Sequence, residues 1–389
     1  MEVKTVFDSQ IDVTKANSHI KEIDIIKAIG IILMVLGHCG FIFKHFIYVF
    51  HMSLFFVVSG YCYNNKNSKD FTNLLQYVLK KVKTLYIPYI LVGILFLLLN
   101  NIFLQYDLIT DNILFSVNAI NEYSGLAGKF SFQIFIVELL KLLCFYGGSV
   151  PFYGATWFLR VLFLTSIIYV ILDYLTQRFL KIEKYQYILR IVVSLGLMLF
   201  SYYCNKIQFK WEILGIEIID KIKYACTACV LLEVGRILRI YMARLINIQR
   251  YGIGIFSGIV LIILNQFGTM ELAQNEIVNP VFFLSASITG FIFCYFLAEM
   301  IIAVKIDKCF CYIGKHTLSI LLFHFLAFKL ITVAQVSIYG LPVYMRASFP
   351  TLYTQWYWVI AYSVIGIGIP LLLEYFYCII KRRICTLFI

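Results

Sequence analysis

Charged residues are scarce in this chain of 389 residues, because Asp, Glu, Lys and Arg together make up only 14% of it. A soluble domain carries about 25% charged residues, so this chain has too few to cover a water-facing surface. Hydrophobic residues account for 61% of the sequence. The composition therefore excludes a soluble globular protein and indicates an integral membrane protein.

The sequence also lacks internal repeats, low-complexity tracts and Gly/Ser linkers, which predicts a single membrane domain. Residues 1–20 are polar and mixed in charge, without the basic start and adjoining apolar stretch of a signal peptide. We assign residues 1–20 to a cytoplasmic N-terminal tail, residues 21–383 to the transmembrane domain and residues 384–389 to a short C-terminal tail.

The eleven cysteines show neither metal-ligand nor disulfide spacing. Most lie within apolar runs, as Cys226 and Cys294 do, where a free cysteine behaves as a small apolar residue. Cys309 and Cys311 are close in sequence but lack partner ligands nearby. We therefore expect no metal site and no permanently bound cofactor.

Long apolar runs, rather than alternating ones, predict membrane-spanning helices and argue against a β-barrel. Residues 131–146 form a weaker candidate, since they contain Glu138 and Lys141 and precede Gly-Gly-Ser-Val-Pro, so we interpret them as an interfacial or re-entrant helix. The ten predicted spans are residues 25–43, 46–62, 85–104, 155–176, 187–204, 223–239, 251–267, 281–304, 313–333 and 356–380.

The net charge of +12 could suggest a nucleic-acid partner, but the basic residues sit in short loops between apolar runs. Ten spans with both termini in the cytoplasm place most Lys and Arg residues, Arg236 and Arg239 among them, on the inner side. Counting residues 131–146 as a further span would remove this bias. The sequence thus predicts an all-α, multi-pass protein of the cell inner or plasma membrane, surrounded by lipids and without nucleic acid.

Ionisable residues inside a membrane are costly and often functional. Lys27 and His38 are eleven residues apart in the first predicted span, which puts both on one helix face and about 16 Å apart along the axis. Asp24 lies three residues before Lys27 and can pair with it. His51, in the second predicted span, lies about as far from the intervening turn as His38 does. These residues alone do not decide whether the protein is an enzyme or a proton-coupled transporter.

The first two spans resemble the opening of the acyltransferase-3 family, whose hallmark is a basic residue, ten residues and a histidine. Here the pattern reads Asp24-Ile-Ile-Lys27, then Gly37-His38, then the stretch from Phe50-His51 to Ser59-Gly60-Tyr61. The family more often has arginine where this chain has Lys27. Weaker matches are the 83–89 segment, Trp157-Phe158-Leu159, and the 313–319 segment that leads to His324. The pattern is most similar to the branch with fucose 4-O-acetylase-like proteins.

The resemblance implies a membrane O-acyltransferase that uses an acyl-coenzyme A, with acetyl-coenzyme A expected, as donor substrate and a saccharide or lipid-linked glycan as acceptor. His38 would then be the catalytic base and His51 would position the substrate or stabilise the oxyanion, by direct transfer or through an acyl-histidine. Donor-binding candidates are Lys27, Lys80, Lys81 and Lys83; supporting candidates are Asp24, Ser59, Trp157, Arg160 and His324.

Two other functions fit a polytopic protein. A transporter or polysaccharide flippase would explain buried charges, although the chain shows neither an inverted repeat nor paired broken helices. A polysaccharide polymerase would be expected to carry paired arginines in its large outer loop, but residues 105–154 contain no arginine.

Overall fold

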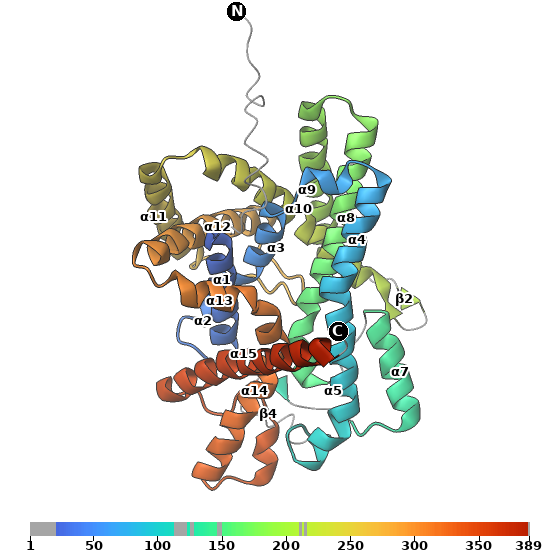
Figure 1. Cartoon of the computed structure of the whole chain (residues 1–389), viewed down its shortest axis with the longest axis vertical. Helices are drawn as coiled ribbons and strands as arrows, with labels where there is room; N and C mark the ends of the chain where they lie inside the picture. The colour runs from blue at the N-terminus through green and yellow to red at the C-terminus, as the bar shows by residue number, and fades with distance from the viewer. Residues whose placement is uncertain are drawn as a thin grey trace, which may run out of the picture.

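The computed structural model describes residues 21–112, 123–124, 128–145, 150–209, 212–213 and 216–387. These residues are almost entirely helical (Figure 1). Seven helical segments are long and apolar enough to cross a membrane, which confirms a helical, multi-pass membrane protein. They are Phe71–Gln105, Pro151–Phe179, Glu183–Lys206, Asn247–Leu264, Pro280–Ala303, Thr317–Ile338 and Trp356–Lys381.

These segments contain most of the long helices of the bundle. Their bounds are α4 (Phe71–Lys81), a π-helical turn η3 (Val82–Tyr86), α5 (Ile87–Gln105), a 3₁₀ turn η4 (Pro151–Thr156), α8 (Trp157–Phe179), α9 (Glu183–Lys206), α11 (Asn247–Leu264), α12 (Pro280–Ala303), α14 (Thr317–Ile338) and α15 (Trp356–Leu387).

Three further predicted spans are also helical, but they are either shorter or richer in charged residues than the seven segments above. They are α1 (Lys21–His38), α3 (His51–Tyr61) and α10 (Ile218–Arg244). The predicted continuous span over 46–62 is wrong in detail, because α2 (Lys44–Tyr48) ends before Val49 and Phe50, and α3 starts afresh at His51. His51 therefore occupies the first turn of a helix rather than its middle.

The remaining elements are short. Helix α7 (Phe132–Leu143) covers the segment predicted to be interfacial, and twelve residues are too few to cross a hydrocarbon core of about 30 Å. The others are η2 (Asn65–Ser68), α13 (Asp307–Lys315), η5 (Val343–Ala347), and two antiparallel strand pairs, β1 (Tyr123–Ser124) with β4 (Ser348–Phe349) and β2 (Glu212–Ile213) with β3 (Ile216–Glu217).

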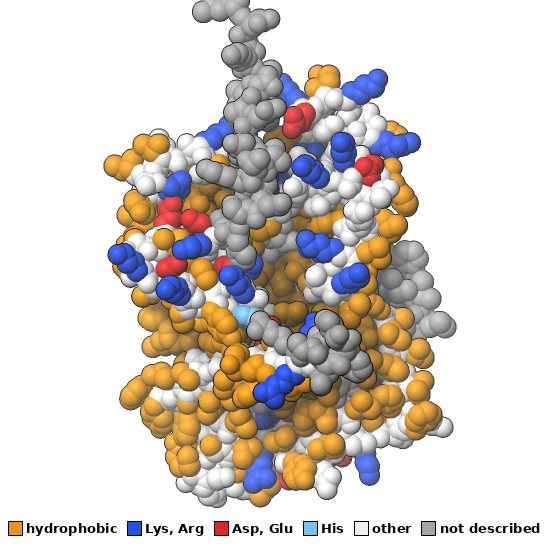
Figure 2. Space-filling model, viewed as in Figure 1, with side chains coloured by type: hydrophobic (Ala, Val, Ile, Leu, Met, Phe, Trp, Pro, Cys, Tyr) orange, Lys and Arg blue, Asp and Glu red, His pale blue; other side chains and the backbone are white. Residues whose placement is uncertain are grey.

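Helices α1, α3, α10 and α14 form the centre of the bundle, and α15 lies across it at a large angle to α4 and α5 (Figure 1). Many large apolar side chains of α11 and α15 are exposed, as expected for a lipid-facing surface. Lys and Arg side chains gather over the upper part of the face in Figure 2, whereas the lower part is mainly hydrophobic. This charge asymmetry matches the pattern that the positive-inside rule describes.

The backbones of α3 and α10 approach each other closely because both helices carry glycine at the contact. A Cβ atom added at Gly60 would lie 2.0 Å from the carbonyl oxygen of Leu232, and one added at Gly235 would lie 2.1 Å from that of Val57. Small residues allow such approach in membrane bundles. The contact fixes the position of α3, which carries His51 and Ser59.

Replacing Gly235 by alanine should therefore destabilise the protein, because the new methyl group meets backbone that cannot move aside. We expect a loss of about 1–3 kcal/mol, typical of overpacking, visible as a lower unfolding temperature in detergent. Gly252→Ala in α11 is the matched control, since its Cβ would meet nothing within 4 Å. Equal unfolding temperatures for the two variants would contradict the close contact.

Candidate active site

A cavity of about 430 Å³ lies between α1, α3, α4, α8 and α14. Its size is within the range of small-molecule sites, about 300–1,000 Å³. One end is polar and basic, with Lys27, Lys80, Lys81 and Asn67 in its wall, while the remaining wall is mostly apolar. Such a cavity suits an elongated ligand with a charged end and an apolar end.

Three of the four lysines predicted to bind the donor line this cavity. Lys27 pairs with buried Asp24 at 3.0 Å, as the sequence predicted, and the pair is positioned by a single turn of α1. Lys81 Nζ lies 5.3 Å from the ring centre of Tyr77, which also lines the cavity. The π turn η3 contributes Thr84 to the same wall, and π turns are frequent at functional sites.

Other predicted residues are distributed around this cavity. Ser59 lines it, from the same face of α3 as Met52 and Phe55. Lys83, by contrast, is exposed and does not appear among the cavity-lining residues that the structure describes. The geometry therefore brings Ser59 to the candidate site and leaves Lys83 outside it.

His38 is the last residue of α1, because Gly40 then adopts a φ of +78°, a left-handed conformation that ends the helix. Its ring stacks on that of His324 from α14, with centroids 5.5 Å apart and planes 25° apart. It also meets the ring of Phe325 edge-on, at 4.9 Å. His38 is half-buried, whereas His324 and His51 are buried. His38 is thus the most accessible of these three histidines.

His324 and His51 are held in the same tautomer by the backbone of their own helices. Nδ1 of His51 lies 2.8 Å from the carbonyl oxygen of Ile47, and Nδ1 of His324 lies 3.0 Å from that of Ile320. A carbonyl accepts, so each Nδ1–H donates, and in a neutral ring Nε2 carries the lone pair. Within the described part of the chain, Nε2 of His324 is buried without a hydrogen-bond partner.

Trp157 and Arg160, predicted as supporting residues, begin α8 but do not line the cavity among the described residues. Trp157 packs edge-on against Phe158, which does line it. Arg160 is buried, and its Nη1 donates to the carbonyl oxygen of Phe145 at 2.7 Å. Trp157 therefore supports the cavity wall through Phe158, whereas Arg160 holds the end of the 128–145 segment.

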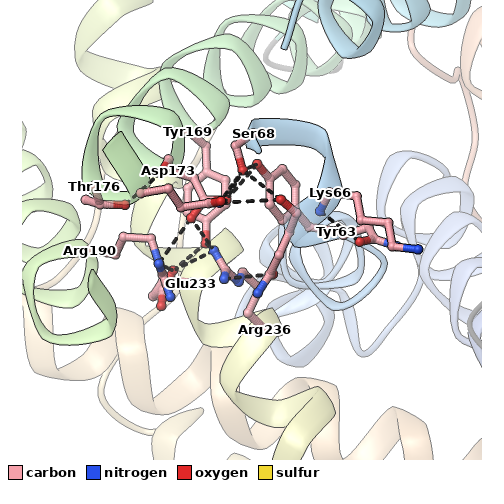
Figure 3. A network of polar contacts seen from close by, with 12 residues as sticks. Tyr63, Lys66, Ser68, Tyr169, Asp173, Thr176, Arg190, Glu233 and Arg236 are labelled. Carbon is pink, nitrogen blue, oxygen red and sulfur yellow. Dashed lines mark hydrogen bonds and ion pairs between the residues drawn. The ribbon is translucent and has the colours of Figure 1, made fainter. Parts of the chain in front are cut away.

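A buried network of charged groups adjoins the basic end of the cavity (Figure 3). Nη1 of Arg236 donates to Asp173 at 3.1 Å and to Tyr169 at 3.0 Å, and Nη1 of Arg190 pairs with the same Asp173 oxygen at 3.1 Å. Glu233 accepts from Tyr169 and lies 3.6 Å from Arg190. Two arginines thus neutralise two carboxylates within one cluster.

The network also fixes the segment that follows α3. Ser68 and Tyr63 both donate to Asp173, the latter at 3.0 Å, and Arg236 Nη2 donates to Asn65 at 2.9 Å. Tyr63 lines the large cavity, so the cluster positions part of its wall.

Arg236 lies within α10 and is buried, so it is part of the predicted 223–239 span rather than of the loop that follows it. Asp173 and Arg190 were not among the sequence-based candidates, although both stand inside predicted spans.

Lys329 is a third buried charged residue that was not among the sequence-based candidates. It lies in α14, and its Nζ donates to the carbonyl oxygens of Arg346 and Ser348 at 2.9 and 2.7 Å. The next residue, Phe349, packs on Phe325 with ring centroids 4.7 Å apart. Lys329 thus holds the 346–349 segment against the aromatic ring that contacts His38.

In the described part of the chain, no three His, Cys, Asp or Glu side chains are grouped so that they could hold a metal ion. What the residues do form is a basic-ended cavity directed toward stacked imidazoles in a membrane bundle. This arrangement has the features of a membrane-bound group-transfer enzyme, with anion-binding groups at one end and acid–base groups at the other.

The chain belongs to the acyltransferase-3 family, whose acyltransferase domain matches residues 20–375, nearly its whole length. Membership confirms the family resemblance of the sequence and supports acyl transfer to a hydroxyl at a membrane. No curated protein and no solved structure matches the chain.

Proposed function

We propose that this protein transfers an acetyl group from cytoplasmic acetyl-coenzyme A to a hydroxyl of a cell-envelope or exported polysaccharide or glycolipid. The observation that supports this most is the cavity whose basic end contains Lys27 and whose other end approaches His38 on the same helix. The proposal includes ten spans, both termini in the cytoplasm and residence in the inner or plasma membrane.

The donor would enter from the basic end. Lys27, Lys80 and Lys81 supply positive charge for the phosphates of coenzyme A, and the apolar walls suit the arm that carries the thioester. The acyl carbon would then point toward the histidines. The acceptor would approach His38 from the opposite side, which is the outer side in this topology.

The chemistry of direct transfer uses His38 as the general base. A ring nitrogen of His38 takes the proton of the acceptor hydroxyl as its oxygen attacks the thioester carbon. The new C–O bond forms and the C–S bond breaks, so that coenzyme A leaves as a thiolate, which then takes the proton from His38 and restores the neutral base. His324 and His51, each with a lone pair on Nε2 when neutral, would accept hydrogen bonds from the acceptor hydroxyls and so orient them.

The direct test is transfer of label from radiolabelled acetyl-coenzyme A by the purified protein in lipid, with glycolipid and polysaccharide fractions offered as acceptors. Base-labile label in an acceptor fraction supports the proposal. Movement of a glycan across the membrane without incorporation of label would instead support a transporter. A fucose-containing acceptor would match the branch that the sequence resembles.

The donor site gives a separate prediction. Lys81→Met should raise the KM for acetyl-coenzyme A about 10–100-fold, since a hydrogen bond to a charged group contributes about 1.5–3 kcal/mol. Lys83→Met is the control, because Lys83 is exposed, close in sequence and outside the cavity wall. The same KM in both variants would remove Lys81 from the donor site. Lys27 is less suitable for this test, since its loss would leave buried Asp24 without its cation.

A further inference from the structure

Three apolar side chains from three different helices stand at one level of the bundle. Glycine contacts show that the chain from Tyr48, the last residue of α2, to Phe55 in α3 runs antiparallel to α1, since Gly30 faces Phe55 and Gly37 faces Tyr48. Met52 lies midway between Phe55 and Tyr48 along the chain, and Met34 lies midway between Gly30 and Gly37. Met34 and Met52 therefore occupy the same depth, and both line the cavity.

Helix α14 brings the third side chain to this depth. Gly314, just before α14, packs against the Asp24 carbonyl at one end of α1, and His324 stacks on His38 at the other. Leu321 lies between these two contacts, near the level of Met34, and it lines the cavity as well. We refer to Met34, Met52 and Leu321 as the collar.

Each collar residue is next to one of the three histidines. Met34 precedes His38 by one turn, or about 6 Å along the axis; Met52 directly follows His51; and Leu321 precedes His324 by three residues. The cavity wall includes the collar residues, but none of the three histidines is among its described members. An acyl group bound in the cavity therefore has to pass the collar to reach His38.

Little of the collar is accessible to solvent in this structure, because Met34 is 2% and Leu321 7% exposed and Met52 is half-buried. Methionine is unbranched and has three rotatable bonds, so two of the three side chains can adapt to a small group. A longer acyl chain requires a larger displacement in a close-packed interior, which is unfavourable.

We propose that Met34, Met52 and Leu321 set the upper size of the acyl group that this enzyme transfers, by admitting an acetyl group to the histidines and excluding longer chains. This inference rests on the proposed acyltransferase function and adds its donor specificity. Selectivity for one methylene in an apolar pocket is about 10–200-fold, so the wild type should prefer acetyl- over butyryl-coenzyme A by at least about 10-fold.

The test compares kcat/KM for acetyl-, propionyl- and butyryl-coenzyme A in purified protein. Met34→Ala should raise the butyryl-to-acetyl ratio about 10-fold or more. Met198→Ala is the matched control, because Met198 is equally buried but lies in α9, away from the cavity wall. If Met34→Ala fails to fold, Met52→Ala and Leu321→Ala on the other two helices should show the same rise in the butyryl-to-acetyl ratio.

The outcomes distinguish failure of the collar proposal from failure of the proposed acyltransferase function. Acetyl transfer by the wild type with the same acyl ratio in the collar variants and Met198→Ala would overturn the collar alone. A wild type that transfers no acyl group from any of the three donors would overturn the proposed function together with it. Met34→Phe offers an opposite change: it should suppress transfer of all three acyl groups while binding of coenzyme A persists.

Discussion

Replacing His38 by alanine should lower kcat for acyl transfer by about 10²–10⁴-fold, the usual contribution of a general base. The KM for acetyl-coenzyme A should change little, because His38 lies beyond the cavity that would hold the donor. Steady-state kinetics with saturating acceptor would measure both constants.

His45→Ala is the control for this measurement. His45 lies in α2, on the turn after α1, and its exposed ring contacts Asn265 at 2.8 Å. Its loss should leave kcat unchanged. His324→Ala should give an intermediate decrease in kcat. The His324 ring orients His38 by stacking on it, but His38 itself takes the proton. Full activity of His38→Ala would exclude the mechanism, whatever the effect at His324.

Replacing Arg236 by methionine should destabilise the folded protein by about 3–5 kcal/mol, the cost of removing one partner from a buried ion pair. The cluster would lose one of its two positive charges, and Asp173 and Glu233 would remain buried with only Arg190. Thermal or denaturant unfolding in detergent would report the loss. Arg244→Met is the control, since Arg244 is exposed on the same helix.

A second substitution distinguishes charge imbalance from lost packing. Asp173→Asn in the Arg236→Met background restores neutrality, so the double variant should lose less stability than the two single variants together. Strictly additive losses would indicate that Arg236 acts through packing alone. The same cluster holds Tyr63 in the cavity wall, so donor binding should weaken in the single variant.

The sequence predicted features that depend on nearby residues. Apolar runs located the helices, the 24–27 spacing predicted the Asp24–Lys27 pair, and the charge of Glu138 and Lys141 marked α7 as a segment that does not cross. Contacts between residues far apart in the chain could not be predicted in this way. Nothing in the sequence indicates that His324 stacks on His38, because that contact depends on how α14 packs against α1.

Charge counting places Arg236 on the inner side but gives no information about its partners. A basic residue at the end of an apolar run normally indicates the membrane boundary. Here Asp173 and Glu233 supply the neutralising charge, so Arg236 can remain inside the bundle. The intramembrane Asp173 was the available signal, since a buried carboxylate requires a cationic partner from some other helix.

One helix carries both the cation at the entrance of the donor cavity and the histidine beyond its far end. Because both residues belong to α1, the separation between Lys27 and His38 is set by the number of residues between them. Inserting a single residue between them would increase their separation along the helix axis by about 1.5 Å and would also turn His38 by about 100° away from the cavity face. Under the proposed function, the donor length that fits between Lys27 and His38 would therefore depend on the number of residues between them.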